Sequence, residues 1–183
     1  MPLKDIIFGK DRYSKSAHRL YVAVVEQARN PVFYSDLGVP DSLDGRFELI
    51  SLHTFLVLHR LKSETGEAGL AIGQGLVDLM FADMDQSLRE MGVGDMGVGK
   101  RVKKMAEAFQ GRVAAYSSAL VADEETQLHD ALRRNLFGTR DQVEAHDLGQ
   151  ISDYLRHQAA FLGQQKSADI LQGIIAFSQP GQK

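Results

Sequence analysis

Hydrophobic and polar positions alternate with helical periodicity along most of the chain. Between residues 17 and 30 the apolar residues recur three or four positions apart, which places them on one face of a helix. Ser14 or Ser16 can cap the start of this helix, and Pro31 ends it, because a residue before proline avoids helical dihedral angles. Its apolar face comprises Leu20, Tyr21, Val24, Val25 and Ala28.

A connection rich in turn formers follows at residues 31–46. It also carries four apolar side chains, so we expect it to pack against the core. These are Phe33, Tyr34, Leu37 and Val39. The next helix is predicted at residues 44–63, where apolar residues surround almost the whole circumference. Such a pattern is typical of a centrally buried helix.

Two long amphipathic helices are predicted next, at residues 67–91 and 97–121. Three glycines in the first of them lower helix stability and therefore indicate close contact with a neighbour; they are Gly69, Gly73 and Gly75. The apolar stripe of the first helix comprises Ile72, Leu76, Leu79, Met80, Met84, Leu88 and Met91. That of the second comprises Val98, Val102, Met105, Phe109, Val113, Tyr116 and Leu120.

Three shorter helices complete the pattern. The first opens at Asp123 and carries Leu128, Leu132 and Leu136, the second covers residues 141–163, and the third follows Ser167 through Ile174 and Ile175. The whole chain, residues 1–183, is thus predicted to be one all-α domain, a bundle of about six to seven helices around a central buried helix. Residues 1–14 are a candidate flexible segment.

Composition narrows the function classes. The 183 residues are enough for one well-buried core, and the net charge of −3 argues against DNA as a partner, so any basic surface must be local. Absence of cysteine excludes disulfides, thiolate zinc sites and cysteine nucleophiles. No stretch approaches the roughly 18 apolar residues that span a bilayer, and the N-terminus lacks the pattern of a secretory signal. We expect a cytoplasmic protein, with the inner face of the membrane as an alternative location.

The stretch GVGDMGVGKRVKKM at residues 92–105 nearly copies a phosphate-binding loop. Gly94, Gly99 and Lys100 match that pattern, but Arg101 stands where a hydroxyl should hold magnesium. The motif also needs a preceding strand, whereas a helical pattern precedes it here. A hinge fits better: Gly92 and Gly94 end one helix at positive φ, and Asp95 caps or favours the start of the next.

Cations crowd the first turns of that next helix. Lys100, Arg101, Lys103, Lys104 and Arg112 stand against Glu107 alone, which leaves a net charge of +4 over residues 99–113. Cations near a helix N-terminus oppose the helix dipole, so local energetics disfavour the arrangement. Two interpretations stay open: a solvated face, or a surface that binds lipid phosphate, RNA phosphate or an acidic protein.

No other cluster indicates catalysis. The six histidines lack metal-ligand spacing, and His53 and His59 flank an apolar run as core or boundary residues would. Asp83 and Asp85 point in different directions on a helix, and Asp85 is placed to pair with Arg89. We predict no catalytic set, no metal site and no cofactor.

Three segments together carry a family resemblance. They are LYVAVVEQARNPVFY (20–34), VPDSLDGRFELISLHTFLVLHRL (39–61) and DMDQSLREMGVGDMGVGKRVKKMAEAFQGR (83–112). In combination they resemble the ubiquinol–cytochrome c chaperone family, in its alphaproteobacterial branch, best over residues 17–120. The resemblance implies an all-α, non-enzymatic assembly factor for ubiquinol–cytochrome c reductase that receives newly made cytochrome b. Mitochondrial members associate with ribosomes and act with a small partner protein.

The resemblance also implies functional positions. Those that match are Tyr34, Asp41, Gly45, Arg46, His53, Asp83, Asp85, Arg89, Glu90, Gly92, Gly94, Asp95, Lys100, Lys103, Lys104 and Arg112. Gln110 departs from the family pattern, which has an aromatic residue there. For partner binding we select Tyr34, Arg46, Asp83, Asp85, Asp95 and the cations Lys100, Arg101, Lys103, Lys104 and Arg112.

The leading interpretation is therefore a helical assembly factor. It would bind cytochrome b or another reductase subunit, with a small partner protein, the ribosome or an anionic membrane as further candidate partners. One alternative is a nucleotide- or ligand-handling enzyme built on residues 92–101. Another is a general adaptor for anionic membrane or RNA.

Overall fold

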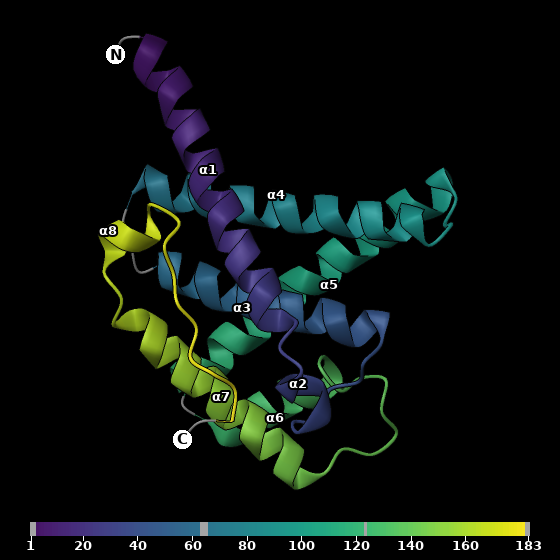
Figure 1. Ribbon diagram of the computed structural model, residues 1–183. Coiled ribbons are helices and arrows are strands. Elements are labelled where there is room, and N and C mark those ends of the chain that lie inside the picture. Colours follow the sequence, from purple (N-terminus) through teal and green to yellow (C-terminus); the bar gives the residue numbers. More distant parts are fainter. Residues whose placement is uncertain (1–2, 63–65, 123, 182–183) are drawn as a thin grey trace.

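The computed structural model describes residues 3–62, 66–122 and 124–181, with side chains from Tyr13 onward, and these residues form helices without any strand (Figure 1). Six helices have ten residues or more, and two are single turns, which confirms the predicted all-α class. In chain order they are α1 Leu3–Ala28, α2 Val32–Ser35, α3 Leu43–Lys62, α4 Glu67–Glu90, α5 Asp95–Ala122, α6 Glu125–Arg134, α7 Ala145–Gly163 and α8 Ser167–Ile170.

Helix α3 is the centre of the molecule. It contacts α1, α4, α5 and α7, and every residue from Phe47 to Val57 is buried, including polar Ser51 and Thr54. The prediction of a central buried helix is confirmed. The connection before it also packs inward as predicted, since Phe33, Leu37 and Val39 are buried.

Small residues let α4 lie close against its neighbours. A Cβ at Gly75 would come within 3.0 Å of the Ala17 Cβ in α1, and one at Gly73 within 3.2 Å of Leu58 in α3. The predicted close contact at these two glycines is confirmed. In Figure 1, α4 crosses α1 near the top of the view, with α3 below.

The first helix is longer than its pattern predicted. It begins at Leu3 rather than near Ala17, so residues 3–14 belong to α1, while residues 1–2 of the candidate flexible segment lie outside the described residues. Neither serine caps the helix as proposed. Ser16 lies within α1 and is buried, and its hydroxyl donates to the Leu171 carbonyl at 2.9 Å because the C-terminal segment packs alongside.

The C-terminal prediction was wrong in length. The last helix, α8, is a single turn, because Gly173 adopts a φ of 80° and redirects the chain. The segment that follows runs along α7 (yellow in Figure 1), where the Gln158 side chain donates to the Ser178 carbonyl at 2.8 Å. Helix α7 ends at Gly163 as predicted, but begins at Ala145 rather than near Asp141.

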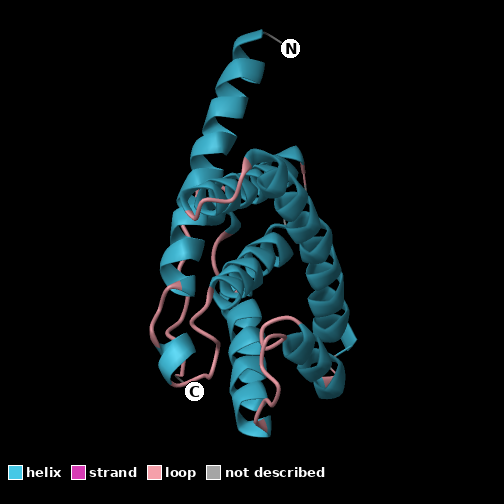
Figure 2. Cartoon of the chain, turned by 90° about the vertical axis from the view of Figure 1, so that its right-hand side faces the viewer, coloured by secondary structure: helices cyan, strands magenta, loops and turns pink. Residues whose placement is uncertain are grey.

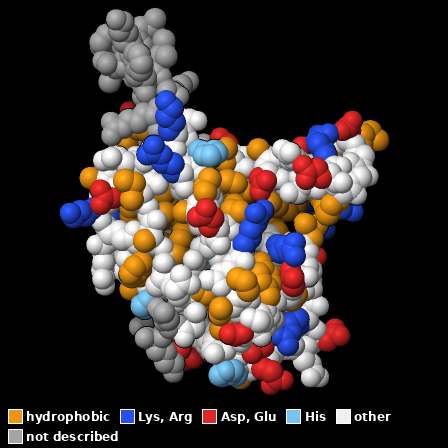
Figure 3. Space-filling view, viewed as in Figure 1, with side chains coloured by type: hydrophobic (Ala, Val, Ile, Leu, Met, Phe, Trp, Pro, Cys, Tyr) orange, Lys and Arg blue, Asp and Glu red, His pale blue; other side chains and the backbone are white. Residues whose placement is uncertain are grey.

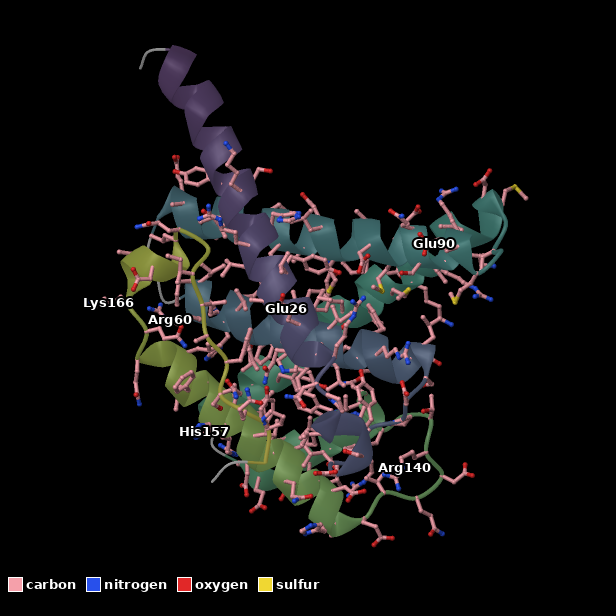
Figure 4. The ribbon with its side chains drawn as sticks, viewed as in Figure 1. Glu26, Arg60, Glu90, Arg140, His157 and Lys166 are labelled. Atoms are coloured by element: carbon pink, nitrogen blue, oxygen red, sulfur yellow. The ribbon has the colours of Figure 1, made fainter. Side chains whose placement is uncertain are left out.

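Arg60 joins this end of the molecule to α3. Its guanidinium donates to the Leu162 carbonyl at 2.9 Å and to the Gln165 carbonyl at 2.8 Å, where α7 ends. Figure 4 labels Arg60 on α3 beside the connection between α7 and α8. The buried Arg60 thus provides hydrogen-bond donors for carbonyl groups at the end of α7 that would otherwise lack partners.

A buried polar chain connects α1, α3 and α7. The Gln27 amide donates to the Tyr154 hydroxyl at 2.9 Å, and that hydroxyl donates to His53 Nε2 at 2.7 Å. His53 Nδ1 must carry the proton, because its partner at 2.7 Å is the Leu49 carbonyl, which can only accept. His53 is therefore a satisfied core residue, as predicted, and burial lowers its pKa to about 4.

The buried, neutral state of His53 in these hydrogen bonds predicts that the stability of the protein is sensitive to acid. The pKa of His53 falls from 6.5 in the unfolded chain to about 4 in the folded protein, so the unfolded state binds a proton first as the pH drops. The free energy of unfolding should fall between pH 6.5 and about 4, by up to roughly 3 kcal/mol from this group. Urea titrations across that range should show a smaller fall for His53→Gln; an equal fall would contradict the assignment.

Candidate functional site

Two cavities meet at the first turns of α3. They measure 750 and 770 Å³ and share the lining residues Leu43, Phe47, Met84 and Ser87. We call them together the α3 groove, with a first lobe toward α1 and α2 and a second lobe toward α5. Figure 2 views α3 nearly end-on between these elements. Figure 3 shows hydrophobic side chains gathered below α4, with acidic and basic side chains around them.

The start of α3 is fixed by a tight local turn. A Cβ at Gly45 would lie 1.9 Å from the Pro40 carbonyl oxygen, so only glycine fits there. The Gly45 amide donates to the Ser42 hydroxyl at 3.1 Å, which satisfies one of the free amides of the first turn. This close packing gives a physical reason for glycine at a position that the family resemblance singled out.

The first lobe brings together three of the selected residues: Tyr34, Arg46 and Asp83. Arg46 pairs with Asp41 at 2.8 Å, and the Tyr21 hydroxyl donates to Asp83 at 2.6 Å. Burial raises the pKa of Tyr34, whose hydroxyl donates to the Ala28 carbonyl at 3.1 Å. The lobe is thus mainly apolar, and three of its four charged side chains, Asp41, Arg46 and Asp83, have partners.

The second lobe has a buried ion pair in its wall. Arg112 of α5 binds both carboxylate oxygens of Glu48 of α3, with one contact at 2.6 Å, and the two side chains are only 14% and 7% exposed. Burial raises the pKa of Glu48 although Arg112 opposes that shift. The sequence had suggested that Arg112 belongs to an exposed basic face. The structure shows instead that it is mostly buried in this ion pair. It anchors α5 to α3.

The remaining cations of α5 differ in whether they line the groove. Arg101 and Lys104 line the second lobe. Lys100 and Lys103 are exposed outside it, and Lys103 lies 4.0 Å from Glu107. Because α5 begins at Asp95, all four lie beyond its first turn, where the helix dipole has little effect. The predicted conflict with the dipole is therefore absent, and the lining of the lobe is the stronger reason to consider Arg101 and Lys104.

Residues 95–100 are helical, so the near-copy of a phosphate-binding loop forms no loop. Gly92 has a φ of 82°, which confirms the predicted hinge there. Gly94 does not have a positive φ; instead its carbonyl accepts the Gly97 and Val98 amides at the start of α5. In the described residues no three histidine or carboxylate side chains are grouped as metal ligands would be.

The apex between α4 and α5 lies away from the groove. Arg89 joins Asp85, at 2.5 Å, to Asp95, so these two predicted residues stabilise the hairpin and do not line either lobe. The predicted pairing of Asp85 with Arg89 is confirmed. Met91 is 51% exposed rather than part of the apolar stripe, because α4 ends at Glu90, labelled in Figure 4.

Arg140 was missed in the sequence, although it shapes the groove. It lies in the connection between α6 and α7, as Figure 4 shows, and donates to the Gly38 carbonyl at 3.0 Å and to Asp147 at 2.9 Å. These bonds tie the segment before α3 to the far wall of the second lobe. Glu48 was also missed, although a carboxylate within a helix that is apolar all round was a usable signal.

The Glu48–Arg112 pair should dominate the stability of this wall. Arg112→Met leaves a buried, unpaired carboxylate and should lower the free energy of unfolding by about 3 kcal/mol at neutral pH. The double variant Glu48→Leu/Arg112→Met removes both charges and should recover much of that loss. Urea denaturation measures both values; a double variant as unstable as the single one would contradict this role of the pair.

The chain matches known proteins over most of its length. The family model described as ubiquinol-cytochrome C chaperone covers residues 35–177. Ubiquinol-cytochrome-c reductase complex assembly factor 1 of Xenopus laevis is 28% identical over 93% of this chain and 82% of its own length. The human protein of that name is also 28% identical, but the matched part is 55% of its length. For Protein CBP3, mitochondrial, of Saccharomyces cerevisiae the identity is 28% and the share is 45%.

A solved structure agrees with the whole fold. The Cbp3 homolog from Brucella abortus superimposes with a TM-score of 0.85 at 36% identity, over 100% of this chain and 99% of that one. None of the described helices is long and apolar enough to cross a membrane. The family predicted from the three sequence segments is confirmed: the chain belongs to the ubiquinol–cytochrome c chaperone family.

Proposed function

We propose that this protein is a non-enzymatic assembly factor for ubiquinol–cytochrome c reductase, and that its client is newly made cytochrome b or an early assembly intermediate. Family membership and the names of the relatives support the reductase as the target. The observation that carries the client-binding part is the α3 groove, in which Tyr34, Arg46 and Asp83 line one lobe and Arg101 and Lys104 the other.

The groove has the chemistry of a peptide-binding site. Its floor is apolar, and Leu43, shared by both lobes, is 43% exposed at the start of α3. Concave apolar surfaces with a few charged groups at the rim are typical binding sites. A membrane protein before assembly exposes apolar segments next to polar ones, and such a segment could cover this floor while its polar ends meet the rim.

The internal pairing of charges supports binding rather than catalysis. Asp41 is paired with Arg46, Glu48 with Arg112, and Asp83 accepts from Tyr21, so these carboxylates stabilise the walls. The enzyme alternative required a loop at residues 92–101, and most of that stretch is helix. Titration calorimetry with ATP and magnesium tests it: we expect no binding heat.

We further propose that the protein works in the cytoplasm and peripherally on the inner face of the membrane. The apex between α4 and α5 supports this location, because Met91 and Met96 are 51% and 93% exposed there. Exposed apolar side chains at the end of a helical hairpin suit insertion into a lipid surface. Co-sedimentation with anionic vesicles tests it, and no sedimentation would contradict it. The ribosome and a small partner protein stay predictions.

Leu43→Asp should separate client binding from folding. It places a carboxylate on the floor shared by both lobes, at an exposed position, and should lower cytochrome b co-isolation and the level of assembled reductase severalfold. Val121→Asp is the matched control, because Val121 is 81% exposed and lines neither lobe. Helical content by circular dichroism should stay unchanged in both variants. Normal cytochrome b recovery with Leu43→Asp would argue against the groove.

A further inference from the structure

The two lobes of the groove differ in charge. The first lobe is lined by two arginines and two aspartates, so its net charge is zero. The second is lined by Arg101, Lys104, Arg112 and Arg134 against Asp44 and Glu48, a net charge of +2. The chain as a whole carries −3. A surplus of cations in one concave site on an acidic protein indicates an anionic ligand.

The surplus belongs to three specific side chains. Arg112 is neutralised by Glu48, which leaves Arg101 and Lys104 from α5 and Arg134 from the end of α6. None of these three forms an ion pair with a carboxylate in the described part of the chain, and Asp44 is the other acid in the lining. Arg101 and Lys104 are three residues apart, so they lie on the same face of α5.

The floor between these cations is aliphatic and adaptable. It includes Met84, Leu88, Met105 and Leu136, and two of these are methionines, whose flexible side chains fit varied apolar partners. The one aromatic residue in the lining, Phe47, is buried and lies against Arg112, so the lobe offers no exposed ring for stacking nucleotide bases. The occupant must therefore combine apolar groups with negative charge.

We infer that the second lobe binds a peptide segment in which apolar side chains lie next to carboxylates. The apolar part covers the methionine-lined floor, and the carboxylates pair with Arg101, Lys104 and Arg134. This inference rests on the proposed client-binding function and specifies which chemical type of client segment the groove recognises. The charge-neutral first lobe takes the less charged continuation of the same segment.

Fluorescence anisotropy with two labelled synthetic peptides tests the inference on the full chain. One peptide has leucine, phenylalanine and methionine followed by glutamates, and the other has lysines in place of the glutamates. The acidic peptide should bind, more weakly at high salt, and the lysine peptide should not. Arg101→Glu/Lys104→Glu should weaken binding by roughly tenfold or more. Arg134→Gln should weaken it less, because it removes a charge without reversing it.

The chain provides a matched control on the same helix. Lys100→Glu/Lys103→Glu makes the same charge change at two exposed positions of α5 that do not line the lobe, and should leave peptide affinity within about twofold, because exposed charges outside the lobe are screened. Equal weakening by both double variants would overturn the inference, as would equal binding of the lysine peptide. The inference would also be overturned if the acidic peptide did not bind and Arg101→Glu/Lys104→Glu instead abolished binding to anionic vesicles.

Cytochrome b co-isolation distinguishes failure of this inference from failure of the proposed function. If Leu43→Asp loses cytochrome b but Arg101→Glu/Lys104→Glu keeps it, the groove still binds a client and the acidic-segment inference is wrong. If both lose it while Lys100→Glu/Lys103→Glu keeps it, the inference is supported. If none of the variants loses cytochrome b, the proposed function itself fails, and the inference with it.

Discussion

The buried pair between Glu48 and Arg112 is the interaction on which the groove depends. Desolvating two charges costs several kcal/mol, and the bidentate contact between α3 and α5 offsets that cost only in one relative placement of the two helices. That placement sets which side of α5 faces the cavity. Arg101 and Lys104 line the second lobe for this reason, whereas Lys100 and Lys103 remain outside. A structural ion pair thereby determines which cations of one basic sequence run line the cavity.

The groove combines rigid, hydrogen-bonded walls with an adaptable apolar floor. The polar chain through His53 and Tyr154 and the bonds of Arg60 hold α1, α3, α7 and the C-terminal segment together. Arg140 fixes the segment before α3 against the opposite wall. Between these supports lie methionines and an exposed leucine, which can accommodate an apolar segment without a defined shape. An assembly factor has to hold a partly assembled membrane protein and release it, and a groove of this kind suits both steps.

Periodicity predicted the helical class and the central helix, because α3 is apolar all round and the long helices repeat regularly, whereas the family was predicted from the resemblance of three sequence segments. Periodicity could not show which cations of the basic run line the cavity, since that depends on the distant contact with Glu48. The local pattern also failed at both ends of the chain: α1 begins at Leu3 although its start was predicted near Ala17, and α8 ends at Ile170, shortly before the turn at Gly173, despite the apolar residues that follow. Met91 was assigned to the core although the turn at Gly92 exposes it.

Site-specific photocrosslinking in the native host tests the central claim, that cytochrome b occupies the α3 groove. A photoreactive residue at Leu43, in the groove, can be compared with one at Val22 on α1; the two positions are 43% and 40% exposed, and Val22 lines neither lobe. The account predicts a crosslink to cytochrome b from position 43 and little or none from position 22. Equal crosslinking from both positions, or crosslinking from position 22 alone, would contradict it.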